Sequence, residues 1–308
     1  MTSYLAKRVL STLPVLVGIA AFVFLMLHLV PGDPVMLLVG EGAGASPEAI
    51  NALRRDLGLT DPLPVQFVRY GGEMVRGNWG RSIRFNRPVL ALLLENGRYT
   101  IQLAAAALLV AVAFGLPLGV FAAVQRTRWG DSAAMFVSLV GVSMPSFWLG
   151  ALLIFAFSLH FKWFPAIGQG GINRLVLPAA ALAFAPMASF ARLVRSSLLE
   201  VFGEDYVRTA RAKGIAERVV VIRHALRNAL IPVVTFFGLE TGRLLAGAFV
   251  VETVFSRIGL GRLIVNAILN KDFPVVQGAV FFVAVLYVAV NLLVDLSYAV
   301  LDPRVRFE

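Results

Sequence analysis

Six long apolar runs constrain the fold of this chain more than any other feature of its sequence. Each is long enough, at about 1.5 Å of rise per helical residue, to cross a hydrocarbon core of about 30 Å. Lipid offers no hydrogen bonds to the backbone, so runs of this length are expected to be helices. The sequence therefore predicts an all-α integral membrane protein with six transmembrane helices, at residues 9–30, 99–124, 133–160, 175–194, 231–251 and 275–300.

The composition agrees with a membrane protein and excludes several other classes. Of the 308 residues, 58% are hydrophobic and 15% are charged, which is more apolar surface than a soluble domain of this size can bury. The net charge of +10 comes from basic residues at the ends of the apolar runs, as membrane topology requires, so nucleic-acid binding is disfavoured. The chain has no cysteine, which excludes a disulfide or a thiolate metal site.

Lysine and arginine residues in the short loops predict the orientation of the chain. They are concentrated on the side that holds both termini and residues 192–227, so this side is expected to be cytosolic. The first run is longer than a signal-peptide core of about 7–15 residues, and we expect it to be retained as a helix. The predicted domains are then an N-terminal transmembrane helix (1–30), an extracytoplasmic helical subdomain (31–98) and a core of five spans (99–308). The subdomain either covers the outer helix ends or docks a soluble partner.

The segment Gly203–Pro232 is the one long polar stretch in the second half of the chain, and it predicts two short helices. In the first, acidic Glu204 and Asp205 favour the helix N-terminus and Lys213 favours the C-terminus. Gly214 fits a helix end that requires a positive φ angle. The second helix has an apolar stripe at helical spacing, formed by Val219, Ile222, Leu226 and Leu230. The segment is either a loop held in the cytosol by its charges or a folded surface that a soluble partner grips.

Two charged residues lie inside the fifth apolar run. Counting from Pro232, Glu240 and Arg243 are about 12–17 Å into the membrane, near its middle. Charges at this depth normally face a protein interior or a water-filled path. At i and i+3 the two side chains can also pair with each other. A pathway or subunit-interface role and simple mutual pairing both remain open.

Prolines and glycines interrupt the regular helix pattern of two other runs. Pro145 permits a kink in the third run, which serves either packing or gating. Gly115 and Gly119 flank Pro117 in the second run, where small residues favour close contact between helices.

The sequence carries no pattern for catalysis or for a resident cofactor. His28, His160 and His224 are not spaced as metal ligands on one helix. Gly259-Leu260-Gly261 does not follow a strand, which excludes a dinucleotide-binding turn. There is no Walker A sequence, so any ATP hydrolysis must belong to a separate subunit. The chain is not expected to be an enzyme.

Several motifs resemble those of a known family. DYVRTARAKG followed by HALRNALIP is similar to the cytoplasmic EAA loop of ABC importer permeases, and more narrowly to the dipeptide/oligopeptide/nickel branch. The usual Glu-Ala-Ala triplet is Arg208-Thr209-Ala210 here and the gap from Gly214 to Pro232 is longer, as is usual in the peptide branch. Further similar stretches cover nearly the whole chain: Pro31–Pro34, Ser143–Trp148, Val250–Phe255, Gly259–Gly261 and Asp302–Arg304. Asn78-Trp79 and Ile258 depart from the commonest pattern.

The resemblance implies the first (B-type) permease subunit of a binding-protein-dependent importer in a bacterial or archaeal cytoplasmic (inner) membrane. Its implied partners are a second homologous permease, two cytosolic ATPase subunits that bind ATP and Mg, and an extracytoplasmic solute-binding protein. The implied substrate is a di- or oligopeptide, with nickel chelates, glutathione and oligosaccharides as alternatives. An autonomous channel or secondary carrier is the alternative of a different class, and it would not need a two-helix cytosolic handle.

The resemblance also assigns site residues. Within the coupling loop at residues 195–230, the positions expected to contact the ATPase are Glu204, Asp205, Tyr206, Arg208, Thr209, Ala210, Arg211, Ala212, Lys213 and Gly214. The residues expected to line the pathway are Glu240 and Arg243, from their depth in the fifth run, Pro145, from its position in the third run, and Glu252.

Overall fold

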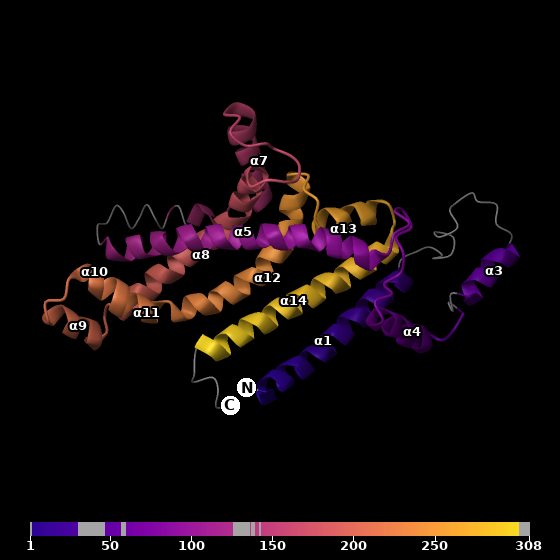
Figure 1. Cartoon of the computed structure of the whole chain (residues 1–308), viewed down its shortest axis with the longest axis horizontal. Coiled ribbons are helices and arrows are strands. Elements are labelled where there is room, and N and C mark those ends of the chain that lie inside the picture. Colours follow the sequence, from indigo (N-terminus) through magenta and orange to yellow (C-terminus); the bar gives the residue numbers. More distant parts are fainter. Residues whose placement is uncertain are drawn as a thin grey trace. The chain divides into compact units, whose positions relative to one another are not determined.

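Helices form all the regular structure in the described part of the chain, which agrees with the all-α prediction (Figure 1). The computed structural model describes residues 2–29, 47–56, 60–125, 136, 139–141 and 143–301. Among these residues, four helices are long and apolar enough to cross a membrane. They are α5 (Val89–Val124), α8 (Asn173–Val201), α12 (Ile231–Val254) and α14 (Phe273–Leu301).

The first and third predicted spans have shorter described apolar helices. Helix α1 (Thr2–Leu29) has its described apolar part at Leu10–Met26. The sequence predicted one helix for the third run, but the structure interrupts it. The chain becomes extended at Pro145 (φ −62°, ψ 135°). Proline lacks the N–H that an uninterrupted helix needs, and its ring clashes with the preceding turn. Helix α7 (Ser146–Leu153) follows this break and continues as the π-helix η1 (Ile154–His160). Residues 126–135 of this region lie outside the described part.

Helix α5 begins ten residues before the predicted start of the second span. The sequence placed that start at residue 99, but the helix already begins at Val89, directly after Pro88. The apolar pattern is interrupted by Glu95, Asn96 and Arg98, so hydropathy alone did not include this first part of the helix. The Asn96 amide donates to the Leu92 carbonyl oxygen one turn earlier (2.7 Å), so the polar residue is satisfied within the helix.

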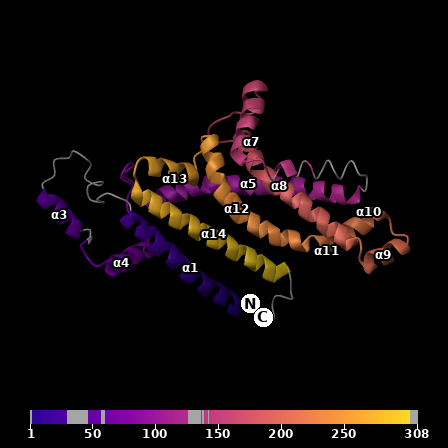
Figure 2. The ribbon, with the colours of Figure 1, turned by 180° about the vertical axis from the view of Figure 1, so that it is seen from behind.

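The chain divides into two compact units. Unit 1 consists of Met1–Gly97, Leu263–Leu292 and Arg306–Glu308, and unit 2 consists of Arg98–Arg262 and Leu293–Val305. In unit 1, α1 and the first part of α14 run side by side (Figure 2). The Gln277 amide donates to the Val23 carbonyl oxygen between these helices (3.2 Å).

The segment at residues 31–98, predicted to be a helical subdomain, contains two short helices in unit 1. They are α3 (Pro47–Asp56) and α4 (Leu63–Val75). The second packs against α1, where Phe24 contacts the rings of Phe67 and Tyr70. Burial raises the pKa of Tyr70 to about 12, so its hydroxyl stays protonated.

A buried carboxylate holds the loop that precedes α5 in unit 1. Asp272 is 1% exposed and accepts hydrogen bonds from the Ser82 hydroxyl and from the backbone N–H groups of Ile83 and Arg84. Trp79 packs edge-on against Phe281 and Phe282 of α14. The loop is therefore fixed to the start of α14 by both polar and aromatic contacts.

Helix α8 is the packing centre of unit 2, and α7 and α12 both pack against it. Small residues allow α5 to approach it closely, as the sequence predicted. A methyl group on Gly115 would lie 2.7 Å from the Met187 carbonyl oxygen, and one on Gly119 would lie 2.5 Å from that of Ala191. The two backbones approach so closely that no side chain fits between them.

We expect Gly119→Ala to destabilise the protein, because its new methyl group would press on the backbone of α8. The loss should be about 1–3 kcal/mol, as for other overpacked sites. Gly18→Ala in α1 is the matched control, since a methyl group there meets no atom within 4 Å. Thermal unfolding of the purified chains in lipid nanodiscs measures both, and equal melting temperatures for the two variants would contradict the α5–α8 contact.

Candidate coupling loop and translocation residues

The first helix of the polar segment is α9 (Asp205–Ala212), in agreement with the prediction of a short helix ending at a glycine. Glu204 occupies the N-cap position and Lys213 the C-cap position. Gly214 has φ +73°, a conformation that side chains rarely adopt. The Gly214 N–H donates to the Arg211 carbonyl oxygen (2.9 Å) and the Ile215 N–H to that of Ala210 (3.4 Å). This is the Schellman pattern, which ends a helix sharply.

One arginine ties α9 to both of its neighbours. The Arg211 guanidinium donates to the two carboxylate oxygens of Glu217 (2.6 and 3.1 Å), across the turn that follows α9. The same guanidinium lies over the ring of Phe202, at the end of α8, 5.2 Å from its centroid. The hydrogen bond to Glu217 raises the pKa of Arg211 above its ordinary value, so the cation is retained.

Other contacts fix α9 against the second half of the segment. The Asn228 amide donates to the Tyr206 hydroxyl oxygen (2.8 Å), 22 positions away in the sequence. Val207 is fully buried and Ala210 is 6% exposed on the inner face of α9, which packs against η2 (Val220–Ala225). The segment therefore folds as one compact elbow, which we call the coupling elbow (residues 202–230).

The second half of the coupling elbow differs from the sequence prediction. It comprises α10 (Glu217–Val219), η2 and α11 (Leu226–Ala229). The predicted apolar stripe is wrong, because Val219 and Ile222 are 41% and 55% exposed. The buried residues are instead Val220, Val221, Ala225 and Ala229. The π-helical turn changes the angular step between residues, so an α-helical periodicity selects the wrong face.

The outer face of the coupling elbow combines apolar and basic side chains. Tyr206 is 39% exposed, and the apolar residues Val219 and Ile222 are also exposed. The remaining predicted coupling residues Arg208, Thr209, Ala212 and Lys213 are also exposed. Exposed apolar side chains on a charged, folded surface are typical of a protein-docking site.

The charged pair in α12 is asymmetric. Arg243 donates to the Glu240 carboxylate (3.1 Å), which confirms that the two side chains pair. The Glu240 side chain is 7% exposed and the Arg243 side chain is 72% exposed. The carboxylate is therefore held inside the subunit, whereas the guanidinium projects from its surface near the middle of the helix.

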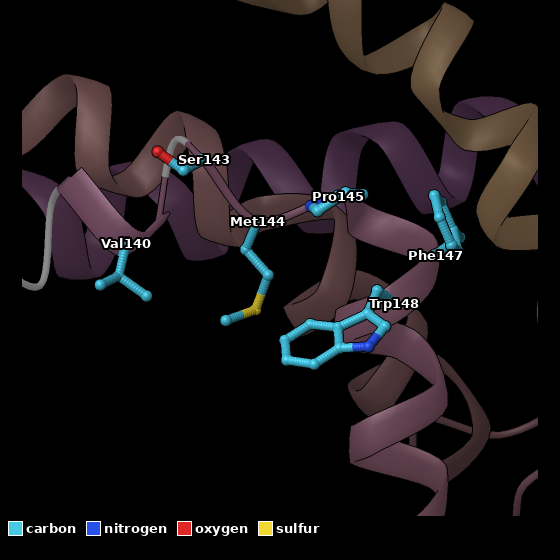
Figure 3. Close-up of a pocket in the computed structure, with 6 residues that line it drawn as sticks. All are labelled: Val140, Ser143, Met144, Pro145, Phe147 and Trp148. Carbon is cyan, nitrogen blue, oxygen red and sulfur yellow. The ribbon is translucent and has the colours of Figure 1, made fainter.

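An open, mostly apolar hollow of about 480 Å³ lies at the break before α7. Figure 3 shows that the side chains of Val140, Met144 and Trp148 point in the same direction beside the extended Pro145. Its full lining is Val140, Ser143, Met144, Pro145, Phe147 and Trp148. The interruption of the helix thus exposes large apolar side chains within a predicted span.

Glu252 has a different environment from the other pathway candidates. It is fully buried at the end of α12, and its carboxylate accepts from the Thr100 hydroxyl (2.6 Å) and the Gly261 N–H (2.8 Å). The Thr100 hydroxyl oxygen in turn accepts from the Leu260 N–H (2.8 Å). These N–H groups begin α13 (Leu260–Leu269), so the carboxylate caps that helix.

This cap explains the Gly-Leu-Gly sequence that follows α12. A methyl group on Gly259 would overlap the Glu252 carboxylate, and one on Gly261 would overlap the backbone of Phe249. Neighbouring Arg257 is 3% exposed and donates to the Arg174 carbonyl oxygen (3.1 Å). Burial lowers the pKa of Arg257, while the nearby Glu252 carboxylate opposes that shift. Sequence reasoning missed Thr100, because a single threonine in an apolar run carries no distinguishing pattern.

Among the described residues, no group of three histidine, aspartate or glutamate side chains is placed to hold a metal ion. His160 instead makes an edge contact with Phe161 (ring centroids 4.9 Å apart).

We expect Thr100→Val to destabilise the chain by about 1–3 kcal/mol, because it leaves the buried Leu260 N–H and a Glu252 oxygen without a partner. Valine has nearly the same shape, so the effect isolates the hydroxyl group. Thr100→Ser keeps the hydroxyl and should lie much closer to the parent. Thermal unfolding in nanodiscs tests the pair, and a valine variant more stable than the serine variant would refute the cap.

Comparisons with known proteins agree with this architecture. Residues 115–307 match the family described as binding-protein-dependent transport system inner membrane component, and residues 1–108 match the N-terminal family of the same membrane components. The glutathione transport system permease protein of Salmonella paratyphi A (strain ATCC 9150 / SARB42) is 42% identical over 308 residues, which cover all of both chains. A Brucella abortus (strain 2308) protein, named as a permease of a peptide transport system, is 42% identical over 316 residues, again with both chains fully covered. The chain therefore belongs to the binding-protein-dependent transport system inner membrane components, as a permease of the peptide-transporting ABC family.

Proposed function

We propose that this chain is one of two permease subunits in an ATP-driven importer of di- and oligopeptides. It would cross the cytoplasmic membrane six times with both termini in the cytosol, and together with a second, homologous permease it would form the translocation pathway. Two cytosolic ATPase subunits would bind ATP and Mg, and an extracytoplasmic binding protein would deliver the substrate. The extracytoplasmic subdomain at residues 31–98 would contribute to docking that binding protein.

The observation that carries the proposal is the folded coupling elbow between α8 and α12. A loop held in place only by its charges needs no Schellman turn, no buried face and no bond between Tyr206 and Asn228. The exposed Tyr206, Val219 and Ile222 give a soluble ATPase an apolar surface to grip. Both features support a mechanical role at residues 195–230.

The contacts of α9 suggest how force would pass into the membrane. Arg211 holds α9 against Phe202 at the end of α8, and α11 packs against both α8 and α12. A push on α9 would therefore reach both spans. ATP binding would close the ATPase pair and favour the outward-facing state, and hydrolysis would restore the inward-facing one. A ligand shifts such an equilibrium only through its different affinities for the two states, so ATP and the loaded binding protein must both prefer the outward-facing state.

The pathway would be lined by the exposed groups of the middle spans. Pro145 with its apolar hollow and Arg243 with its partner Glu240 remain our candidates. We leave Glu252 out of the pathway and assign it to the α12–α13 cap, because its carboxylate is buried and hydrogen-bonded within its own subunit.

Glutathione is a second candidate substrate, favoured by the 42% identity to a permease named for glutathione transport. It is itself a tripeptide with free carboxylates, so the same pathway chemistry serves both candidates. Purifying the binding protein encoded beside this chain and identifying its bound ligand by mass spectrometry separates them.

The proposed assembly is tested by purifying the chain from its native membrane in mild detergent. We expect it to bring down an ATPase pair and a second permease, and ATP hydrolysis should rise when loaded binding protein is added. A chain that purifies without an ATPase, or with its coupling elbow accessible to protease from the extracytoplasmic side, would overturn the assignment.

We predict that Gly214→Val uncouples ATP hydrolysis from uptake while the protein still reaches the membrane. Valine at φ +73° strains the turn by roughly 1–2 kcal/mol and so shifts α9 on its support. Gly171→Val is the matched control, because Gly171 has φ +75° and likewise meets no atom within 4 Å of an added methyl group. Uptake and ATP hydrolysis are measured together in proteoliposomes. Normal uptake by the Gly214 variant, or equal uncoupling in both variants, would remove the elbow from the mechanism.

A further inference from the structure

Arg243 occupies an unusual place for an arginine. Counting from Ile231, it is the thirteenth of the 24 residues of α12, so it lies at the centre of a helix long enough to cross the membrane. Its side chain is 72% exposed. On the same helix face, Leu239 and Val250 are 57% and 47% exposed, and Ala246 is also exposed. The guanidinium is therefore the one charged group among the exposed apolar side chains of this face (Leu239, Ala246 and Val250).

The charge of Arg243, at this depth, makes lipid an unfavourable environment for the exposed side chain. A charged guanidinium at the middle of the hydrocarbon is expensive unless it faces a protein interior or water. From the centre of α12, its side chain is too far from either membrane surface to reach the headgroups, since half of 24 residues spans about 18 Å. Arg243 must therefore face the pathway or a second protein chain.

The pairing with Glu240 leaves most of the guanidinium free to bind a ligand. One nitrogen, Nη1, donates to the carboxylate of Glu240, and the structure gives Arg243 no other partner among its described residues. A guanidinium has five N–H donors in a fixed plane, so a full edge remains available for a carboxylate. The bond to Glu240 restrains the side chain and so prepares that edge for binding.

The same pair determines which charge a ligand group must carry to bind here. The Glu240 side chain is 7% exposed and its carboxylate is turned inward, so it cannot reach a cationic group in the pathway. Arg243 presents positive charge alone. A zwitterionic peptide would be attracted by its carboxylate and repelled at its ammonium group.

We infer that Arg243 forms a carboxylate-binding site in the middle of the translocation pathway, at which the C-terminal carboxylate of a peptide is held while it crosses. The inference rests on the proposed function and deepens it by naming the group recognised and the residue that recognises it. Glutathione, with its free carboxylates, fits the same site. The apolar neighbours Leu239, Ala246 and Val250 exclude competing polar groups and strengthen the ionic contact.

The experiment measures binding to the complete importer without its binding protein, so that the preferences of that protein do not enter. The complex is reconstituted in nanodiscs, and equilibrium dialysis compares trialanine with trialanine amide, which lacks the C-terminal charge. The parent complex should bind the free acid about tenfold more tightly than the amide, the lower end of the range for a charge-assisted hydrogen bond. Arg243→Gln should abolish this preference and Arg243→Lys should restore part of it. Arg76→Gln, which removes an exposed arginine outside the long spans, should leave the preference intact.

The outcomes separate this inference from the proposed function. Equal binding of acid and amide by the parent, no detectable binding of the acid, or a preference that survives Arg243→Gln would each overturn the carboxylate site. Loss of the second permease from the Arg243→Gln complex would also overturn it, because Arg243 would then be an interface residue. ATP-driven peptide uptake by the parent complex with its binding protein decides the proposed function separately.

Discussion

The close packing of α8 is the interaction on which the second unit depends. Gly115 and Gly119 bring the backbone of α5 against α8, and α7 and α12 pack on the same helix. In a membrane, contact between helices comes mainly from such close packing, because lipid is as apolar as the side chains it replaces. The coupling elbow begins at the C-terminal end of this helix. In the proposed mechanism, a firmly packed α8 would let force on the elbow move a span, whereas a loosely held helix would deform locally.

Buried carboxylates satisfy backbone N–H groups at helix ends and in loops. Glu252 accepts the Gly261 N–H at the start of α13, and Asp272 immediately precedes α14 while accepting N–H groups from the loop before α5. Helix N-termini carry partial positive charge and unpaired donors, so a carboxylate there is favourable even when buried. The same acids join segments that are distant in sequence, such as Thr100 and Gly261. Glu252 thereby fixes the turn before α13, and Asp272 fixes the loop before α5; hydropathy alone predicts the position of neither.

Sequence reasoning succeeded where one strong local rule operated. Apolar run length located the four long spans, and glycine at a polar helix end predicted the positive φ of Gly214. It failed where a non-local contact or an irregular turn decided the outcome. The π-helical turn at η2 displaced the buried face from Val219 and Ile222, and Pro145 divided a run that hydropathy had joined. The Glu252 cap depends on Thr100, which lies 152 residues away, and no single-sequence pattern connects them.

The geometry of α12 links the coupling elbow to the carboxylate site. The elbow joins α12 at Ile231, and Arg243 lies twelve residues further on, about 18 Å along the axis. If α12 pivots at the elbow, a tilt of about 10° displaces Arg243 sideways by about 3 Å. A displacement of about 3 Å is enough to break a hydrogen bond between Arg243 and a bound carboxylate. A modest rigid-body motion would thus exchange a bound carboxylate for a released one, with no rearrangement of the Arg243 side chain. In the proposed mechanism, substrate release and the ATPase cycle would then depend on the motion of one helix, α12, which adjoins the elbow and carries Arg243.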